Sequence, residues 1–507
     1  MVTRNELISG LSWNTLTVVL QVVIQLVYTG LLARIISPDS FALMGIVLGI
    51  MGFAEIFSQV GIGPALIQRK EVHQQHINGA FYTAIILGLI FFLVFVLCAP
   101  AIASVYGIPE LELIVQVVCS SFIISALAVV PRSMLMKEMR FKIFFRASMI
   151  SIVGGNLIVG LLLAYLEYNL WAYVWALFAQ NVLMTLALWY YQPTKITRIW
   201  KWKFTRELIR YGSGSTLFNA LNYLATKLDV LLVPFFLRGQ LPVMTLTQKE
   251  SAAMYERSNY AMTQPITVMG KLSDSVLFSG MSKMQDEDAR LRKMMRVATT
   301  LLSVIIVPTT IFIIFFSGEI IRVWLGSKFM EAVPILQVLF IAVIFRVLSK
   351  LGDSLLRAKD AVFRGAWIKA VYVVLIGTGI FFSTEHGMIY VAASVVVATF
   401  IHYLMNMFLC TQLIGLKWMD LLLALAPSIG LGLVVSTIAW ITSSVSEAMN
   451  LPAVVSLLTG LLAIGSCVVI LIYSWPQLLG KREDNMLNFL PNRLKSFTLI
   501  QRMLARL

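Results

Sequence analysis

Residues 211–237 read YGSGSTLFNALNYLATKLDVLLVPFFL, a stretch long and apolar enough to cross a bilayer as a helix. One side of that helix is polar, because polar residues recur at intervals of three or four positions. They are Ser215, Asn219, Asn222, Thr226 and Asp229. A polar stripe inside a membrane needs water or a polar neighbour. The stretch therefore predicts a transmembrane helix that borders a polar interior.

A second stretch, at the start of the chain, has the same design. Ile8 to Ala33 contains no charged residue, and polar side chains share one helical face at Asn14, Gln21, Gln25 and Tyr28. It is too long for the apolar part of a signal peptide and lacks a small-residue cleavage site, so we expect a first transmembrane helix. Two such helices predict two bundles around a water-filled cavity. The alternative is that the amides only join packed helices.

The composition excludes a soluble globular protein. Hydrophobic residues make up 59% of the chain and charged residues 13%, whereas about a quarter of the residues in a soluble domain are charged. We therefore predict an all-α polytopic membrane protein. The four cysteines all lie in apolar segments without metal-ligand spacing, which predicts reduced core residues. They are Cys98, Cys119, Cys410 and Cys467.

We predict about 14 transmembrane helices. Their expected spans are 8–34, 40–66, 77–103, 110–136, 142–165, 170–191, 208–236, 252–281, 294–316, 332–357, 362–383, 387–414, 419–442 and 451–475. Most of the 40 Lys and Arg lie in the inner polar stretches, and the outer ones hold only Arg34, Arg238, Lys249, Arg322 and Lys328. Basic loops stay in the cytoplasm, so this asymmetry predicts cytoplasmic termini. It also accounts for the net charge of +15 without a nucleic-acid partner.

An internal repeat predicts two matched halves. Residues 113–137 align with 334–358, so that Gln116 meets Gln337 and Leu135 meets Leu356. We expect two pseudo-symmetric six-helix bundles in parallel orientation, over 1–191 and 207–414, joined by a basic cytoplasmic linker over 192–206. Two additional transmembrane helices are expected in 415–480. The sequence leaves two roles for them equally open: they form a groove for a lipid tail, or they support the bundle and face the lipid. The tail, 481–507, is expected to form a basic amphipathic helix on the anionic inner leaflet.

Charged residues inside the spans are expensive, because each costs roughly 2.5–3.5 kcal/mol against lipid. Arg257, Gln264 and Lys271 follow at intervals of seven and share a helical face. On another span a cationic stripe is formed by Arg346, Lys350, Asp353 and Arg357. Basic groups outnumber acidic ones in the spans, so a shared cavity would attract a phosphate or diphosphate headgroup. The alternative for each cation is pairing with a nearby carboxylate. Three further cations near inner ends are expected to reach the headgroups instead: Arg132, Arg146 and Lys369.

Three acidic residues, Glu55, Asp229 and Asp274, are candidates for binding H+ or Na+ and coupling its gradient to transport. Glu55 precedes GIGP (61–64), which predicts a distortion of the second span. The sequence shows no nucleophile with a base, no phosphate-binding loop and no metal-ligand cluster. We therefore expect a protein that is not an enzyme and has no cofactor besides a coupling ion.

Several phrases of the sequence resemble a known family. LLARIISPDSFALMGIVLGIMGFAEIFSQVGIGPALIQRK (31–70), LDVLLVPFFL (228–237), AMYERSNYAMTQPI (253–266) and AVPILQVLFI (332–341) are similar to bacterial polysaccharide exporters of the Wzx-type flippase group. That group belongs to the multidrug/oligosaccharidyl-lipid/polysaccharide (MOP) superfamily. The likeness is to the subgroup of colanic acid and teichuronic acid exporters.

The resemblance implies a flippase of the bacterial cytoplasmic membrane. Its substrate would be undecaprenyl diphosphate carrying an oligosaccharide, its partners membrane lipids and a polysaccharide polymerase, and its mechanism alternating access. By this resemblance, the residues that would bind the diphosphate are Arg257, Lys271, Arg346 and Lys350. Asn14, Gln21, Gln25, Tyr28, Asn219, Asn222 and Gln264 would line the sugar cavity. Gln21 and Gln25 stand where peptidoglycan-precursor flippases have a cation, which favours a different glycan.

Two other functions remain open on the sequence. An ion-coupled exporter of cationic drugs would need an acid-dominated cavity, which the charge balance disfavours. A membrane scaffold for glycan-assembly enzymes would need no polar stripes. An integral-membrane glycan enzyme is a weaker third, because no paired acidic motif lies in a predicted loop.

Overall fold

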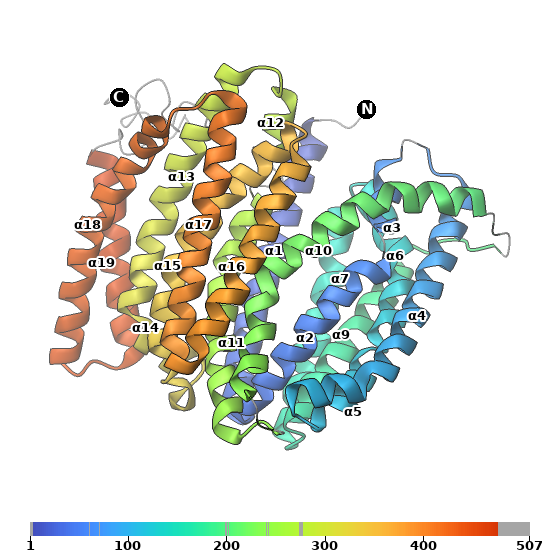
Figure 1. The fold of residues 1–507 in the computed structure, drawn as a ribbon, viewed down its shortest axis with the longest axis horizontal. Helices are drawn as coiled ribbons and strands as arrows, with labels where there is room; N and C mark the ends of the chain where they lie inside the picture. The colour runs from blue at the N-terminus through green and yellow to red at the C-terminus, as the bar shows by residue number, and fades with distance from the viewer. Residues whose placement is uncertain are drawn as a thin grey trace. The chain divides into compact units, whose positions relative to one another are not determined.

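The computed structural model describes residues 4–59, 61–69, 71–197, 200, 202–239, 241, 243–272 and 277–474. Over these residues the chain is helical and contains no strand (Figure 1), which confirms the all-α prediction. Thirteen segments of the described part are long and apolar enough to cross a membrane. The protein is therefore a multi-pass membrane protein, and the expectation of about 14 spans is confirmed to within one.

The expected span 252–281 is the exception. Helix α11 (Leu246–Leu272) has 27 residues, about 40 Å at 1.5 Å per residue, which is enough to cross a bilayer. Its polar and charged residues, however, leave it without a sufficiently apolar window. Residues 273–276, which include Asp274, lie outside the described part. A helix of this kind must be shielded from lipid by other parts of the protein.

The helices group into two compact units. Unit 1 comprises residues 1–257 and 380–385, and unit 2 comprises 258–379 and 386–507. Helix α10 (Trp202–Arg238) groups with unit 1, although we assigned it to the second bundle on the basis of the repeat. The arrangement as two six-helix bundles stays a prediction.

Unit 1 contains the first six predicted spans. These spans are formed by α1 (Arg4–Ile35), α2 (Pro38–Gln59), α3 (Ile62–Gln68), α4 (Gln74–Tyr106), α5 (Glu110–Val118), α6 (Ser121–Lys137), α7 (Phe141–Ile152), the π-helix η1 (Val153–Gly160), α8 (Leu161–Tyr165) and α9 (Leu170–Tyr191). Helix α10 and the start of α11 complete the unit. The predicted distortion of span two is confirmed, because Gly61 adopts φ 61° between α2 and α3. Span four is also broken, at a turn between α5 and α6.

Helix α10 packs along α2 through glycines. A methyl group on Gly49 would lie 2.7 Å from Cδ2 of Leu231, and one on Gly52 would overlap the ring of Tyr223. The Tyr223 hydroxyl donates to the carbonyl of Leu48 at 3.1 Å. The absence of side chains on this face of α2 lets the two helices approach closely. This contact explains why α10 groups with unit 1 despite its place in the repeat.

The basic linker is anchored to α4. The amide of Asn78 donates to Oγ1 of Thr197 at 2.5 Å and accepts from its backbone N–H at 3.1 Å. Arg69 forms an ion pair with Glu207 at the start of α10, and the guanidinium lowers the pKa of that carboxyl. The linker is thus a fixed elbow over its described residues. Its contact with lipid headgroups stays a prediction.

Unit 2 contains the remaining long helices. They are the end of α11, α12 (Ser279–Lys283), α13 (Asp288–Phe315), α14 (Ser317–Trp324), the 3-10 turn η3 (Ser327–Phe329), α15 (Ala332–Ala358), most of α16 (Val362–Ser383), α17 (Met388–Ile414), α18 (Trp418–Ala448) and α19 (Ala453–Ser474). A second 3-10 turn, η4 (Thr384–His386), lies between α16 and α17. Helices α15 and α17 pack against each other, as do α13 and α18.

The last two helices form a pair at one edge of unit 2 (Figure 1). An apolar cluster that includes Val304, Phe316 and Leu431 joins them to α13 and α14. Their other face is exposed, with Leu433 and Leu462 each 70% accessible, as expected of side chains that face lipid. The two additional transmembrane helices are therefore present, and whether they hold a lipid tail stays open. The amphipathic helix expected over 481–507 lies outside the described residues.

A close backbone approach between η1 and α9 gives a first prediction. A methyl group on Gly155 of η1 would lie 2.6 Å from both Cα and N of Gln180 in α9, and backbone atoms cannot move aside as a side chain can. We expect Gly155→Ala to destabilise the protein by about 1–3 kcal/mol, measured as thermal unfolding in detergent. Gly465→Ala in α19 is the control, because it has nothing within 4 Å and should be neutral or stabilising by up to about 1 kcal/mol. Equal shifts in both variants would contradict the close contact.

Candidate functional site

A charged cluster lies inside unit 2, where α15, α16 and α17 meet. The Lys369 ammonium lies 3.1 Å from Oδ2 of Asp353, and the Asn406 amide donates to Oδ1 at 3.1 Å. None of the three residues is more than 9% exposed. The expectation that Lys369 reaches the headgroups is therefore wrong. Its helical register turns it toward a carboxylate on α15, and pairing offsets part of the cost of placing either charge in the membrane.

Two of the predicted diphosphate ligands adjoin this cluster. Arg346 and Lys350 precede Asp353 by two turns and one turn on the same face of α15. Arg346 is 7% exposed. Lys350 extends toward α11, because a methyl group on Gly270 would lie 3.8 Å from its Cε. Over the described residues the cluster thus holds three cations, Arg346, Lys350 and Lys369, and the carboxylate of Asp353. A role for this surplus of positive charge in binding a diphosphate stays a prediction.

The other two predicted ligands lie in different surroundings. Lys271, on α11, is exposed and next to the residue that Lys350 approaches. Arg257 belongs to unit 1, is 1% exposed, forms an ion pair with Glu256 and lies 4.4 Å from the ring centroid of Phe41. The face shared by Arg257 and Lys271 therefore does not give them one environment. Arg257 is therefore paired with a nearby carboxylate, which is the alternative stated for each cation. Its contact with a diphosphate stays a prediction.

The polar residues of the first helix also lie in different surroundings. Gln25 accepts a hydrogen bond from the Asn156 amide of η1 at 2.8 Å, and Tyr28 is fully buried with its ring 6.1 Å from that of Tyr173. For Gln25 the structure matches the alternative in which amides join helices. Gln21 is half-buried. The side chain of Asn14 lies outside the described part.

The remaining predicted cavity residues are more accessible. Asn219 is exposed and Asn222 half-buried on α10. Gln264 is half-buried, and its amide donates to the Tyr260 carbonyl at 3.1 Å. Their contact with a sugar stays a prediction.

Two of the three predicted coupling residues belong to unit 1. Asp229 is 1% exposed and accepts hydrogen bonds from the Tyr255 hydroxyl at 3.2 Å and the Val230 N–H at 2.9 Å. Glu55 is half-buried and lines two cavities. Asp274 lies outside the described residues. Glu55 therefore borders a cavity that could admit an ion.

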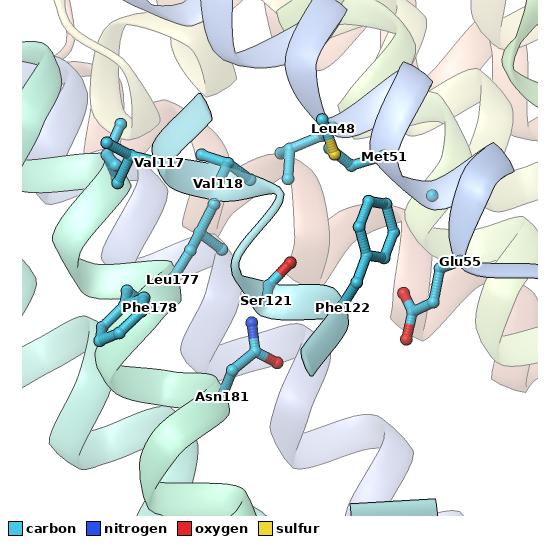
Figure 2. Close-up of a pocket in the computed structure, with 12 residues that line it drawn as sticks. Leu48, Met51, Glu55, Val117, Val118, Ser121, Phe122, Leu177, Phe178 and Asn181 are labelled. Atoms are coloured by element: carbon cyan, nitrogen blue, oxygen red, sulfur yellow. The ribbon is translucent and has the colours of Figure 1, made fainter. Parts of the chain in front are cut away.

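Two cavities lined by described residues of unit 1 have volumes of about 130 Å³ and about 370 Å³. Both are lined by Glu55 of α2 and Asn181 of α9, so they meet at these two side chains. Figure 2 shows the smaller cavity, where the Asn181 amide points toward the Ser121 hydroxyl and Phe122 lies between them and Glu55. The breaks after α2 and between α5 and α6 border these spaces.

Sequence reasoning missed several residues that the structure singles out. Asp353 was recognised only as part of a cationic stripe, and Asn406 and Asn181 were not selected. A weak signal existed, because a lone amide in a strongly apolar span usually has a polar partner. The identity of the partner did not follow from spacing, since Asn406 lies 53 positions from Asp353.

The family comparison matches residues 31–334 to the model for "Polysaccharide biosynthesis protein". Similar curated proteins include the teichuronic acid biosynthesis protein TuaB of Bacillus subtilis, 23% identical over 81% of this chain and 84% of its own length. The lipopolysaccharide biosynthesis protein WzxC of Escherichia coli is also 23% identical, over 71% of each chain. An uncharacterised membrane protein of the cps region of Klebsiella pneumoniae is 24% identical over 79% of this chain and 81% of its own length.

The fold is shared with solved transporters. A structure of the lipid II flippase MurJ in an inward closed conformation matches with a TM-score of 0.69, at 15% identity, over 90% of this chain and 98% of that one. An inward-facing multidrug resistance MATE transporter of the MOP superfamily matches with a TM-score of 0.63, at 14% identity, over 78% and 94%. At these identities the likeness concerns the fold. Because the family match covers more than half of the sequence, this chain belongs to the polysaccharide biosynthesis protein family, with the fold of the MOP superfamily.

Proposed function

We propose that the protein is a flippase for undecaprenyl-diphosphate-linked oligosaccharide, which it moves from the inner to the outer leaflet of the bacterial cytoplasmic membrane for cell-surface polysaccharide synthesis. Alternating access would be the mechanism, with both termini in the cytoplasm and no enzymatic step. The names of TuaB and WzxC, which refer to teichuronic acid and lipopolysaccharide biosynthesis, support this class of substrate. The fold shared with a lipid II flippase supports the transport of a lipid-linked sugar.

The observation that carries the proposal is the cationic surplus of unit 2. Arg346, Lys350 and Lys369 lie among membrane spans with Asp353 as the carboxylate of the cluster. Lys369 pairs with Asp353, and Arg346 and Lys350 add two further positive charges to the described residues of this cluster. A diphosphate suits them, since Arg and Lys form charge-assisted hydrogen bonds with phosphate oxygens. A carrier of cationic drugs would require the opposite sign.

Energy would come from an ion gradient, with H+ or Na+ bound at Glu55. Asp229, whose carboxylate accepts two hydrogen bonds, is the alternative ion site. A polysaccharide polymerase is proposed as the partner that receives the flipped substrate.

Proteoliposomes test the function directly. The purified full chain is reconstituted with lipid-linked oligosaccharide extracted from a strain that lacks its gene. A lectin that cannot cross the bilayer then reports the substrate in the outer leaflet. We expect the lectin-accessible fraction to rise with time only when the protein is present, and faster under a pH or Na+ gradient. An accessible fraction equal to that of protein-free liposomes would exclude flipping of this substrate.

A further inference from the structure

The larger cavity of unit 1 has a defined polar lining. Its polar residues come from three helices: Glu55 of α2, Ser125, Arg132 and Ser133 of α6, and Asn181 and Thr185 of α9. The volume of about 370 Å³ lies in the range of about 300–1,000 Å³ that is typical of small-molecule sites. A cavity of this size and lining, among membrane spans, would hold a polar occupant.

The charges of the lining select the kind of occupant. One carboxylate, Glu55, and one guanidinium, Arg132, give the lining no net charge. Arg132 also lies 5.6 Å from the ring centroid of Phe144, which holds its guanidinium at the wall of the cavity. With one charge of each sign, the lining has no net preference for an anion over a cation. A neutral ligand with many hydroxyl groups can donate to the carboxylate and accept from the guanidinium.

The hydrogen-bonding groups of the wall are also suited to hydroxyl groups. Ser133 and Thr185 direct their hydroxyl protons to the backbone carbonyls of Val129 and Asn181, at 2.7 and 2.9 Å, so their oxygens retain acceptor capacity. The Asn181 amide can both donate and accept. Beyond Asn181 the smaller cavity is mainly apolar, with Leu177 and Phe178 among its residues (Figure 2). The polar region therefore ends at Asn181.

We propose that this cavity, between Glu55, Arg132 and Asn181, binds a sugar ring of the transported glycan. The proposal rests on the proposed function and adds a sugar subsite within unit 1, formed by residues other than the predicted cavity-lining amides. The sugar hydroxyls would donate to Glu55 and accept from Arg132 and Asn181. Arg132, which the sequence assigned to headgroup contact, would be a ligand instead.

A cysteine reporter in the cavity wall tests the subsite. Ser125→Cys is introduced into the full chain after Cys98 and Cys467, the two cysteines that are not buried, are replaced by alanine. The rate of alkylation by N-ethylmaleimide is measured by mass spectrometry. Two probes are added separately: the oligosaccharide released from the host's lipid-linked precursor by mild acid, and the intact precursor. Thr245→Cys, in the exposed segment between α10 and α11, is the control reporter.

We expect both probes to slow alkylation at position 125 and neither to slow it at position 245. Asn181→Leu should raise the half-protecting concentration of oligosaccharide by about 3- to 10-fold, as expected for the loss of one or two hydrogen bonds. Gln180→Leu removes a neighbouring amide of α9 that lines neither cavity, and should leave that concentration unchanged.

Three results would overturn the inference: no alkylation at position 125, no slowing by either probe, or equal effects of Asn181→Leu and Gln180→Leu. Protection by the released oligosaccharide alone would show a site for free sugar and refute the link to the lipid-linked substrate. The proposed function is judged separately in proteoliposomes. Normal flipping without protection refutes only the subsite, and protection without flipping refutes only the transport proposal.

Discussion

Replacement of Lys369 by methionine is expected to destabilise the protein by about 3–5 kcal/mol, because it leaves the buried carboxylate of Asp353 without its cation. The pair lies at 3.1 Å with side chains only 4% and 10% exposed, so water cannot take the place of the ammonium. Methionine has a similar length and no charge, which limits the change in packing. The measurement is thermal unfolding of the purified protein, followed by the loss of its monodisperse elution peak.

The second variant is the double replacement Lys369→Met with Asp353→Leu. We expect it to recover most of the lost stability, since removing both charges abolishes the desolvation penalty. Lys359→Met is the matched control, because Lys359 pairs with Asp288 at 2.8 Å while the carboxylate side chain is 46% exposed. An exposed pair contributes about 0–1 kcal/mol. If Lys369→Met were as mild as Lys359→Met, the pair would not be a buried element of the fold.

Much of the fold follows from local patterns. Apolar length determines where a helix can cross a membrane, and thirteen of the fourteen expected spans have a counterpart in the described residues. The break at GIGP was predictable because Gly61 adopts the left-handed conformation that glycine favours. Helix α11 is the instructive exception, since its polarity conflicts with its position among membrane spans. A polar helix among apolar spans must be surrounded by other parts of the chain, because its polar side chains cannot face lipid.

The candidate site was less predictable, because spacing specifies a helical face but not what that face meets. Arg257 and Lys271 share a face of α11, yet one is buried against Glu256 and Phe41 and the other is exposed. Gln25 accepts a hydrogen bond from Asn156, which lies 131 positions away in the sequence. Arg346 and Lys350 lie on one face of α15, as their spacing of four residues predicts, and their contact with a diphosphate stays a prediction. The charge surplus of a set is thus easier to predict than the partner of any one member.

A decisive test of the cationic surplus is the double variant Arg346→Gln with Lys350→Gln, which we expect to lower the flipping rate by about 100-fold or more. A hydrogen bond to a charged group contributes about 1.5–3 kcal/mol, and each 1.4 kcal/mol is a factor of ten. Loss of both cations would therefore reduce transport far beyond the loss of one. Glutamine keeps hydrogen-bonding groups at both positions. The rate is measured with the lectin in proteoliposomes, and the elution profile confirms that the variant is folded.

The matched control is Arg322→Gln with Lys328→Gln, which removes one arginine and one lysine from exposed positions of unit 2. Its net charge equals that of the Arg346 and Lys350 double variant. It should flip at a rate within about twofold of the unchanged protein, since exposed charges are screened by salt.

Arg346→Lys should retain part of the activity, because a cation remains but the two-pronged guanidinium contact is lost. A diphosphate ligand also predicts that inorganic diphosphate slows flipping by the unchanged protein and has a weaker effect on Arg346→Lys. If the Arg346 and Lys350 double variant flipped as fast as the control pair, these cations would hold the helices together without contacting substrate, and the headgroup would have to bind elsewhere.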